Sequence, residues 1–322
     1  MDHHRSRAGR GRCRGAGVTG GIHRLLTGDL INWTRGQAGP LVTFALDERA
    51  PRVVGALLAG AALALSGTVV QAVCRNPLAE PGLLGITGGA GLAGALLVTL
   101  APAAASAQGI GLAAAAGALA AFALVYALAW RGGLESERLV LIGIGVWFAT
   151  SALTTVVVLQ ANPWDTPNIF TWLSGSTYGR TWSQVLPVLG LLIVALPALW
   201  ALHRELDLVG VDEDLPRTVG IRLERLHLGS LTIAALLAAA AVSAVGVVGF
   251  VGLVAPQAAR ALVGGRHRAV IPVAVLLGAL VLSLADTLGR SVIAPAQIPA
   301  GLVVALIGAP YFLYLLKKSR PV

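Results

Sequence analysis

Long apolar runs, separated by short polar segments, fill this chain from residue 53 almost to its end. A helix of about twenty apolar residues is long enough to cross the hydrocarbon core of a bilayer. About nine such runs follow one another, near residues 53–73, 83–103, 108–130, 138–160, 183–202, 228–248, 250–264, 269–289 and 298–316. The pattern predicts an all-α fold, a polytopic membrane bundle of about nine spans. The run at 250–264 is short and interrupted by Gly and Pro, so its ends are weakly defined.

The composition agrees with a protein that faces lipid over most of its surface. Of the 322 residues, 56% are hydrophobic and 12% are charged, whereas soluble domains carry about 25% charged residues. The runs are continuous rather than alternating, which favours helices over a β-barrel. The net charge of +9 fits Lys and Arg collected on cytoplasmic loops, so it does not indicate nucleic acid.

The positions of Arg and Lys give the predicted spans an orientation, because these residues collect on the cytoplasmic side. The segments assigned to that side carry Arg75, Arg131, Arg138, Arg204, Arg217, Arg222, Arg225, Arg266, Arg268, Lys317, Lys318 and Arg320. The opposite side keeps Arg49, Arg52, Arg180 and Arg290. This alternation predicts a cytoplasmic C-terminus.

Sequence patterns that would indicate catalysis or a metal site are missing or misleading. Gly89–Gly94 spells G-x-G-x-x-G, but no strand precedes it and no acidic residue follows about twenty positions later, so helix packing by small residues explains it better. The chain has no G-x-x-x-x-G-K-[ST] phosphate loop, and its six histidines lie outside the predicted spans. We therefore expect neither an enzyme nor a metal or cofactor site. A polytopic membrane enzyme or an ion channel stays a distant alternative.

Three blocks of sequence carry a family resemblance. The first reads RNPLAEPG at 75–82 and continues with LGITGGA, the second reads GVVGFVGLVAPQAAR from residue 246, and the third joins LADTLGR, IPAG and GAPYFL between residues 284 and 313. Together they resemble the FecCD-type permeases of ABC importers for iron–siderophores and vitamin B12, over about residues 27–318. The chain departs from the family pattern at Gln257, where His is usual, and at Gln297, where an acidic residue is frequent.

The resemblance implies a transport role with several partners. The chain would be the transmembrane subunit of a type II importer that moves a ferric siderophore across the cytoplasmic membrane of a bacterium, with vitamin B12 or haem as the alternative cargo. ABC ATPase subunits would supply the energy, and a periplasmic or lipoprotein binding protein would deliver the cargo. A second permease, identical or different, would complete the path.

The resembled family also begins with one more spanning helix, which makes ten. Here residues 1–26 form a basic stretch, predicted to be disordered, before a permease domain at 27–322. We interpret the first helix as missing or wrongly started, with a genuine nine-span variant as the alternative.

Gly and Pro in the three blocks predict helix breaks at membrane depth, which are tolerated only where the backbone faces protein or a water-filled cavity. The candidate pathway or gate residues are Asn76, Pro77, Glu80, Pro81, Gly252, Pro256, Gly308 and Pro310. The segment 75–82 itself is predicted to be a turn at the bilayer surface. Simple tight helix packing is the alternative.

Arg49, Arg52 and Arg290 lie on the side that should lack positive charge. Matching arginines in the resembled family receive carboxylates of the binding protein, so we expect docking here. The alternative is interfacial anchoring, with Arg290 forming an i, i+4 ion pair with Asp286.

The segment 203–227 is the one long charged loop between the predicted spans. It resembles the two short coupling helices that seat in the ATPase subunit, and it supplies the candidate coupling residues Asp212, Glu213, Arg217 and Gly220. The alternative is a solvated loop. On the opposite side, the Trp-rich segment 162–182 predicts an aromatic belt or, by the resemblance, a short helix beside the mouth of the path.

Overall fold

The computed structural model describes residues 32–318 apart from 132–133, 212–221 and 294–295. The chain divides into two units: the first ends at Phe44 and the second begins at Ala45. The described part of the first unit contains α2 (Pro40–Phe44). The basic stretch at 1–26 lies outside the described residues.

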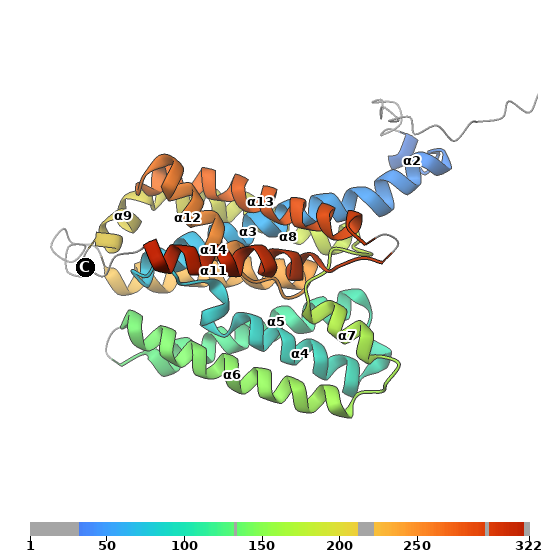
Figure 1. Cartoon of the computed structure of the whole chain (residues 1–322), viewed down its shortest axis with the longest axis horizontal. Coiled ribbons are helices and arrows are strands. Elements are labelled where there is room, and N and C mark those ends of the chain that lie inside the picture. The colour runs from blue at the N-terminus through green and yellow to red at the C-terminus, as the bar shows by residue number, and fades with distance from the viewer. Residues whose placement is uncertain (1–31, 132–133, 212–221, 294–295, 319–322) are drawn as a thin grey trace, which may run out of the picture. The chain divides into compact units, whose positions relative to one another are not determined.

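The second unit is helical throughout its described part (Figure 1). Its elements are η1 (Ala45–Arg49), α3 (Ala50–Val73), η2 (Pro81–Leu84), α4 (Ile86–Leu100), η3 (Pro102–Ala104), α5 (Ala107–Ala129), α6 (Ser136–Gln160), α7 (Thr166–Leu173), α8 (Trp182–Ala201), α9 (His203–Val211), α11 (Leu223–Val245), α12 (Val251–Val263), α13 (His267–Ser291) and α14 (Ala300–Lys318).

Each of the nine predicted spans corresponds to one of these helices, which confirms the predicted membrane bundle. Among the described residues, six helices are long and apolar enough to cross a membrane: Pro40–Val73, Ala107–Ala129, Ser136–Gln160, Trp182–Ala201, Leu223–Val245 and His267–Ser291. Three shorter apolar helices, Ile86–Leu100, Val251–Val263 and Ala300–Phe312, complete the set. The Trp-rich loop contains the short helix α7, as the resemblance implied.

The helices define two opposite ends of the bundle. At the α9 end, the Ser136 hydroxyl donates a hydrogen bond to the Val73 carbonyl, which joins the start of α6 to the end of α3. At the α7 end, the backbone N–H of Val247 bonds to the Trp172 carbonyl. Figure 1 shows α9 and α7 far apart along the bundle. The arginines at 75, 138, 222 and 266 thus group at one end, and those at 52, 180 and 290 at the other.

The helices α3–α6 and α11–α14 repeat one pattern in opposite directions. In each set a long helix is followed by an irregular break and a short helix, α4 or α12. Both short helices begin after a residue in the left-handed conformation, Gly85 with φ 78° and Phe250 with φ 65°. The packing also corresponds, since α3 packs on α13 as α11 packs on α5. Inverted repeats of this kind, with broken helices at their interface, are typical of transporters.

The core lies around α3, whose residues from Ala59 to Val73 are all buried and which packs against α8, α11, α12 and α13. Small residues allow this close approach. A Cβ atom on Gly67 would overlap the backbone carbonyl of Gly252 in α12, so only glycine fits there. The glycines of the G-x-G-x-x-G sequence lie in α4, where Gly89 faces the Gly117 carbonyl and Gly94 faces the Trp172 ring. Helix packing therefore explains that motif, as predicted.

Candidate transport path and its two ends

The two backbone breaks meet inside the bundle. The Glu80 carboxylate accepts a hydrogen bond of 3.1 Å from the backbone N–H of Phe250, the residue that precedes the first turn of α12. A carboxylate is favoured there because the N-terminus of a helix has unpaired N–H groups and a partial positive charge. Glu80 and Phe250 are 170 residues apart in the chain, so this bond ties the first sequence block to the second.

The contact lies at the level of the middle of α3, not at an end of the bundle. A Cβ atom on Gly252 would lie 2.8 Å from Cδ of Pro81 and 3.0 Å from the carbonyl oxygen of Leu63. Ala79, Pro81 and Leu84 are buried. The prediction of a surface turn at 75–82 is therefore wrong from Ala79 onward. The segment begins at the α9 end and then returns into the bundle, where Glu80 finds a backbone donor.

The other candidate pathway residues lie at different places. Gly308 of α14 faces the Phe250 side chain. A Cβ atom added to Gly308 would lie 2.8 Å from Cβ of Phe250. Gly308 thus joins Glu80, Pro81 and Gly252 in one cluster around Phe250. Asn76 accepts the backbone N–H of Leu78 at 2.9 Å within a local turn. Pro256 is buried in α12, whereas Pro310 is exposed on α14 and lies outside the cluster.

A polar network connects the breaks to the α9 end. The Gln71 amide donates to the carbonyls of Gly252 and Leu253 at 3.4 and 3.3 Å. Its oxygen accepts a hydrogen bond from Arg260, and Gln257 donates to the Pro77 carbonyl. Gln257, one of the two departures from the family pattern, thus holds the first block against α12. A pocket of about 250 Å³ opens beside this network, lined by Arg75, Arg260 and His267 among others.

Helix α9 is attached to α13 through one carboxylate. Oδ1 of Asp207 accepts the backbone N–H of His267 at 2.8 Å and lies 2.6 Å from Nδ1 of the same residue. Asp207 thereby satisfies an unpaired N–H at the start of α13. Val209 of α9 packs with Leu223 and Leu226 of α11. The predicted coupling residues Asp212, Glu213, Arg217 and Gly220 lie outside the described residues.

At the α7 end, Asp286 binds two arginines. Arg52 holds it with three hydrogen bonds of 2.8 to 3.1 Å, and Arg290 lies 3.3 Å from Oδ2. The Thr177 hydroxyl donates to the same carboxylate. Only 4% of the Asp286 side chain and 12% of the Arg52 side chain are exposed. The i, i+4 pair considered from the sequence exists, and Arg52 is a second, more buried partner.

Gln297 completes this group of residues, because its Oε1 accepts a hydrogen bond of 2.8 Å from Nη1 of Arg52. Where the family frequently has an acidic residue, the amide here still supplies an acceptor. A pocket of about 270 Å³ lies beside Arg52, Asp286 and Gln297. Arg49 is exposed at the same end of the bundle.

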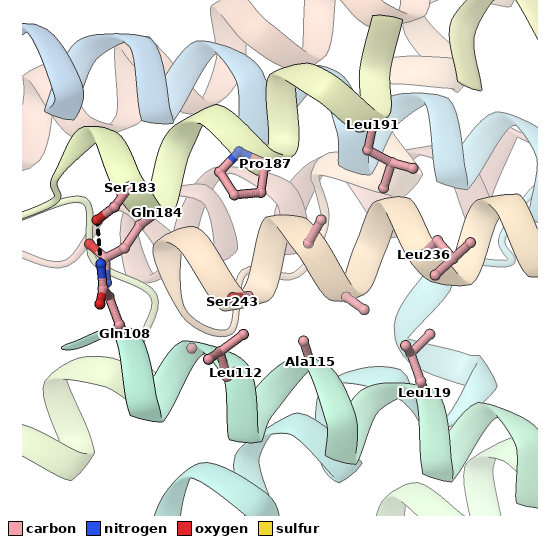
Figure 2. Close-up of a pocket in the computed structure, with 13 residues that line it drawn as sticks. Gln108, Leu112, Ala115, Leu119, Ser183, Gln184, Pro187, Leu191, Leu236 and Ser243 are labelled. Atoms are coloured by element: carbon pink, nitrogen blue, oxygen red, sulfur yellow. Dashed lines mark hydrogen bonds between the residues drawn. The ribbon is translucent and has the colours of Figure 1, made fainter. Parts of the chain in front are cut away.

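The pocket in Figure 2 is of a different kind. It has a volume of about 390 Å³ and lies between α5, α8 and α11. A hydrogen bond of 2.7 Å from Gln108 to Ser183 crosses one end, and leucines, alanines and Pro187 line most of the rest, together with Gln184 and Ser243. No charged side chain lines it. Its chemistry suits an alkyl chain, not a charged or metal-bearing cargo.

The described residues contain no group of three or more His, Cys, Asp and Glu side chains placed to hold a metal ion. The residues around the breaks are instead small, apolar or hydrogen-bonded to backbone.

The model of the FecCD transport family matches residues 19–318. This chain belongs to the FecCD transport family. Among its relatives, the iron(3+)-hydroxamate import permease FhuG of Bacillus subtilis is 39% identical over 84% of this chain and 83% of its own length. The achromobactin permease CbrC of Dickeya dadantii is 40% identical over 84% and 78%. The cobalamin permease BtuC of Halobacterium salinarum is 37% identical over 84% and 73%.

A solved structure agrees with this assignment. A metal-chelate type ABC transporter in an inward-facing conformation superposes with a TM-score of 0.79 at 31% identity, covering 87% of this chain and 89% of that one. The FecCD-family chain is therefore a multi-pass membrane permease subunit of the ABC importer type, a class of subunit that is not itself an enzyme.

Sequence reasoning missed several residues that organise this FecCD-family chain. Gln71 is a polar residue near the end of the apolar run 53–73, which is a usable signal. Phe250 takes a left-handed conformation that no local pattern indicates for a bulky side chain. The sequence places Asp207 and His267 in charged segments but does not indicate that they pair, because they are 60 residues apart.

Proposed function

We propose that this chain moves a ferric siderophore across the cytoplasmic membrane of a bacterium. The observation that carries the proposal is the meeting of the two broken stretches, where Glu80 bonds to the N–H of Phe250. Irregular backbone at membrane depth is tolerated only against protein or a water-filled path, and in transporters it marks the site of transport. FhuG, an iron(3+)-hydroxamate permease by name, supports the choice of cargo.

The partners follow from the same proposal. The sequence contains no phosphate loop of the G-x-x-x-x-G-K-[ST] type, so separate ABC ATPases hydrolyse ATP at the α9 end. A periplasmic or lipoprotein binding protein delivers the cargo at the α7 end, and a second permease, identical or different, faces the path. The α9 end and the C-terminus are then cytoplasmic. Residues 27–322 form the permease domain.

Uptake measurements test the cargo. Cells that lack this protein and cells that carry it should be compared for accumulation of radiolabelled ferric hydroxamate, ferric citrate and vitamin B12. We expect the protein to restore accumulation of at least one ferric chelate and not of B12. Restored B12 uptake with no ferric uptake would favour the alternative cargo, for which the cobalamin permease of Halobacterium salinarum is the supporting relative.

Docking of the binding protein is proposed for Arg49, Arg52 and Arg290 at the α7 end. Positive side chains on this rim would attract carboxylates of the binding protein, which raises the association rate and fixes orientation. Their contributions differ in exposure, because both Arg52 and Arg290 pair with Asp286 but 12% of the Arg52 side chain and 36% of the Arg290 side chain are exposed. Arg52 is thus mainly a positioning residue, and Arg49 and Arg290 offer charge to the partner.

Charge reversal at Arg49 should weaken stimulation of the ATPase by the binding protein. We expect Arg49→Glu and Arg290→Gln to raise the binding-protein concentration needed for half-maximal stimulation by a few-fold, more at low salt than at high salt. Arg131→Glu, at the other end of the bundle, is the control. Equal stimulation of all three variants and the wild type at low salt would remove the docking role.

Coupling to the ATPase is proposed for the segment 203–227, which includes Asp212, Glu213, Arg217 and Gly220. Within its described part, Asp207 of α9 bonds to the first residue of α13, His267. Helix α13 extends from there to Asp286 and Arg290 near its other end. A displacement of α9 by the ATPase would therefore act directly on the helix that carries the docking rim.

Removal of the Asp207 carboxylate should weaken the coupling between the binding protein at the α7 end and the ATPase at the α9 end. We expect Asp207→Ala to leave the chain in the membrane and bound to its ATPase, because α9 keeps its apolar contacts through Val209. Stimulation by the binding protein should fall several-fold, and uptake should fall with it. Asp207→Asn, which keeps an acceptor for the His267 N–H, should recover part of the effect. Unchanged stimulation in Asp207→Ala would contradict this path of coupling.

A further inference from the structure

Arg180 is a buried arginine without an acidic partner among the described residues. Only 9% of its surface is exposed. Its Nε donates a hydrogen bond of 3.0 Å to the Ser176 carbonyl, and no other hydrogen bond or ion pair joins it to the described part of the chain. Burial lowers its pKa to about 10, so the guanidinium still carries its charge at neutral pH. A buried charge is costly unless it is paired or hydrated. The two terminal nitrogens of Arg180 are not among the fully enclosed polar atoms, so they are accessible to a ligand.

The backbone between α7 and α8 directs Arg180 inward. Gly179 has φ of 66°, a left-handed conformation that lets the chain turn just before Arg180. The Ser176 hydroxyl accepts a hydrogen bond of 3.2 Å from the backbone N–H of Tyr178, and the Ser176 carbonyl accepts one from Nε of Arg180. The turn is thus held by its own hydrogen bonds, and the arginine position is built into it.

Arg180 lines a pocket of about 370 Å³ at the α7 end. Asn168, Thr171 and Ser176 also line it and bring amide and hydroxyl groups that can bond to oxygen atoms. Ala107, the first residue of the long helix α5, forms part of its wall, so the positive end of that helix dipole is close by. On another side, Val98, Pro102 and Ile110 give an apolar wall.

Asp165 is the one acidic residue that lines this pocket, and no hydrogen bond or ion pair joins its side chain to Arg180 in the described structure. The pocket adjoins the docking rim, because Thr171, Ser176 and Tyr178 also line the pocket beside Arg52 and Asp286. Any ligand held by Arg180 therefore lies next to the surface proposed for docking.

We propose that the Arg180 pocket binds an anionic oxygen group, a carboxylate or a phosphate, on the α7 side of the permease. The guanidinium offers two donors in a plane, which matches either group. The volume exceeds that of a single small anion, so the ligand has an uncharged body that lies on the apolar wall. Two sources have this chemistry: a carboxylate-bearing chelate on its way to the path, and the phosphate of a phospholipid headgroup. The proposal concerns binding alone and does not depend on which cargo is transported.

Ligand-dependent thermal stability tests the pocket. The full chain, purified in a non-ionic detergent, is unfolded by heat at increasing sodium citrate or sodium phosphate, with ionic strength held constant by sodium chloride. A second arm uses short-chain phosphatidylglycerol. A ligand that binds the folded state raises the unfolding midpoint. For whichever probe does so, Arg180→Gln should raise the half-saturating concentration about tenfold, the loss expected for one charged hydrogen-bonded pair.

Two further variants make the test independent of folding defects. Asp165→Asn removes a negative charge from the pocket and should lower the half-saturating concentration several-fold, an effect opposite to that at Arg180. Arg131→Gln, which loses the same charge at the α9 end, should behave as wild type. A response to citrate or phosphate alone assigns the site to a soluble anion, and a response to phosphatidylglycerol alone assigns it to a lipid. The proposal is overturned if no probe raises the wild-type midpoint, if a folded Arg180→Gln variant responds as wild type, or if Asp165→Asn does.

Discussion

Replacing Asp286 with Asn should lower the free energy of unfolding by about 3–5 kcal/mol, the usual result of removing one partner of a buried ion pair. The substitution preserves shape but leaves Arg52, 12% exposed, without its countercharge. It also removes the countercharge of Arg290 in α13. Unfolding in mixed detergent micelles, followed by tryptophan fluorescence, measures the change.

Glu48→Gln is the matched control for this prediction. Glu48 is exposed in η1, close in sequence to Arg52, and its substitution removes the same charge. We expect a change within about 0.5 kcal/mol, as for most surface substitutions. If Asp286→Asn and Glu48→Gln proved equally stable, the carboxylate of Asp286 would not hold the α7 end together.

The second large effect is expected at Gly67, where α3 touches α12. The Cβ of Gly67→Ala would overlap the Gly252 carbonyl, which is backbone and cannot rotate away. The helices must separate, and overpacking of this kind costs about 1–3 kcal/mol or more. Because Gly252 also contacts Pro81, the shift should disturb the meeting of the breaks. We expect transport to fall more steeply than the amount of folded protein.

Gly190→Ala provides the same chemical change at an open site. Gly190 lies in α8 with nothing within 4 Å of an added Cβ. Alanine there should leave stability unchanged or raise it by up to about 1 kcal/mol, because glycine is the poorer helix former. Equal stability of Gly67→Ala and Gly190→Ala would mean that α3 and α12 are not in close contact.

The lengths of the apolar runs predicted the helices well, because each length is read from neighbouring residues alone. Each predicted span corresponds to a helix, and the ion pair of Asp286 with Arg290 follows from their spacing of four residues. The depth of the segment 75–82 was not predictable in this way. Its polar residues indicated a surface, yet Glu80 bonds to an N–H that lies 170 residues away. The sequence shows that a residue is polar but not which distant group satisfies it.

The candidate site residues likewise divide into those that the local sequence indicated and those that depend on the fold. Glycines and prolines of the sequence blocks marked the breaks, and four of the eight candidates contact each other or Phe250, namely Glu80, Pro81, Gly252 and Gly308. The roles of Arg52 and Asp207 could not be derived, since each depends on a partner in another helix. The family resemblance supplied the order of the blocks, whereas the contacts between them came from the fold.

ATP-driven import by the reconstituted complex tests the central claim most directly. The permease, its ATPase and its binding protein are placed in liposomes, and accumulation of a radiolabelled ferric chelate is measured with ATP on the ATPase side. We expect accumulation that requires ATP and the binding protein, that is lost in the Gly67→Ala variant and that is retained in Gly190→Ala. Accumulation that persists without ATP, or that is equal in the two variants, would contradict a path formed where the two broken stretches meet.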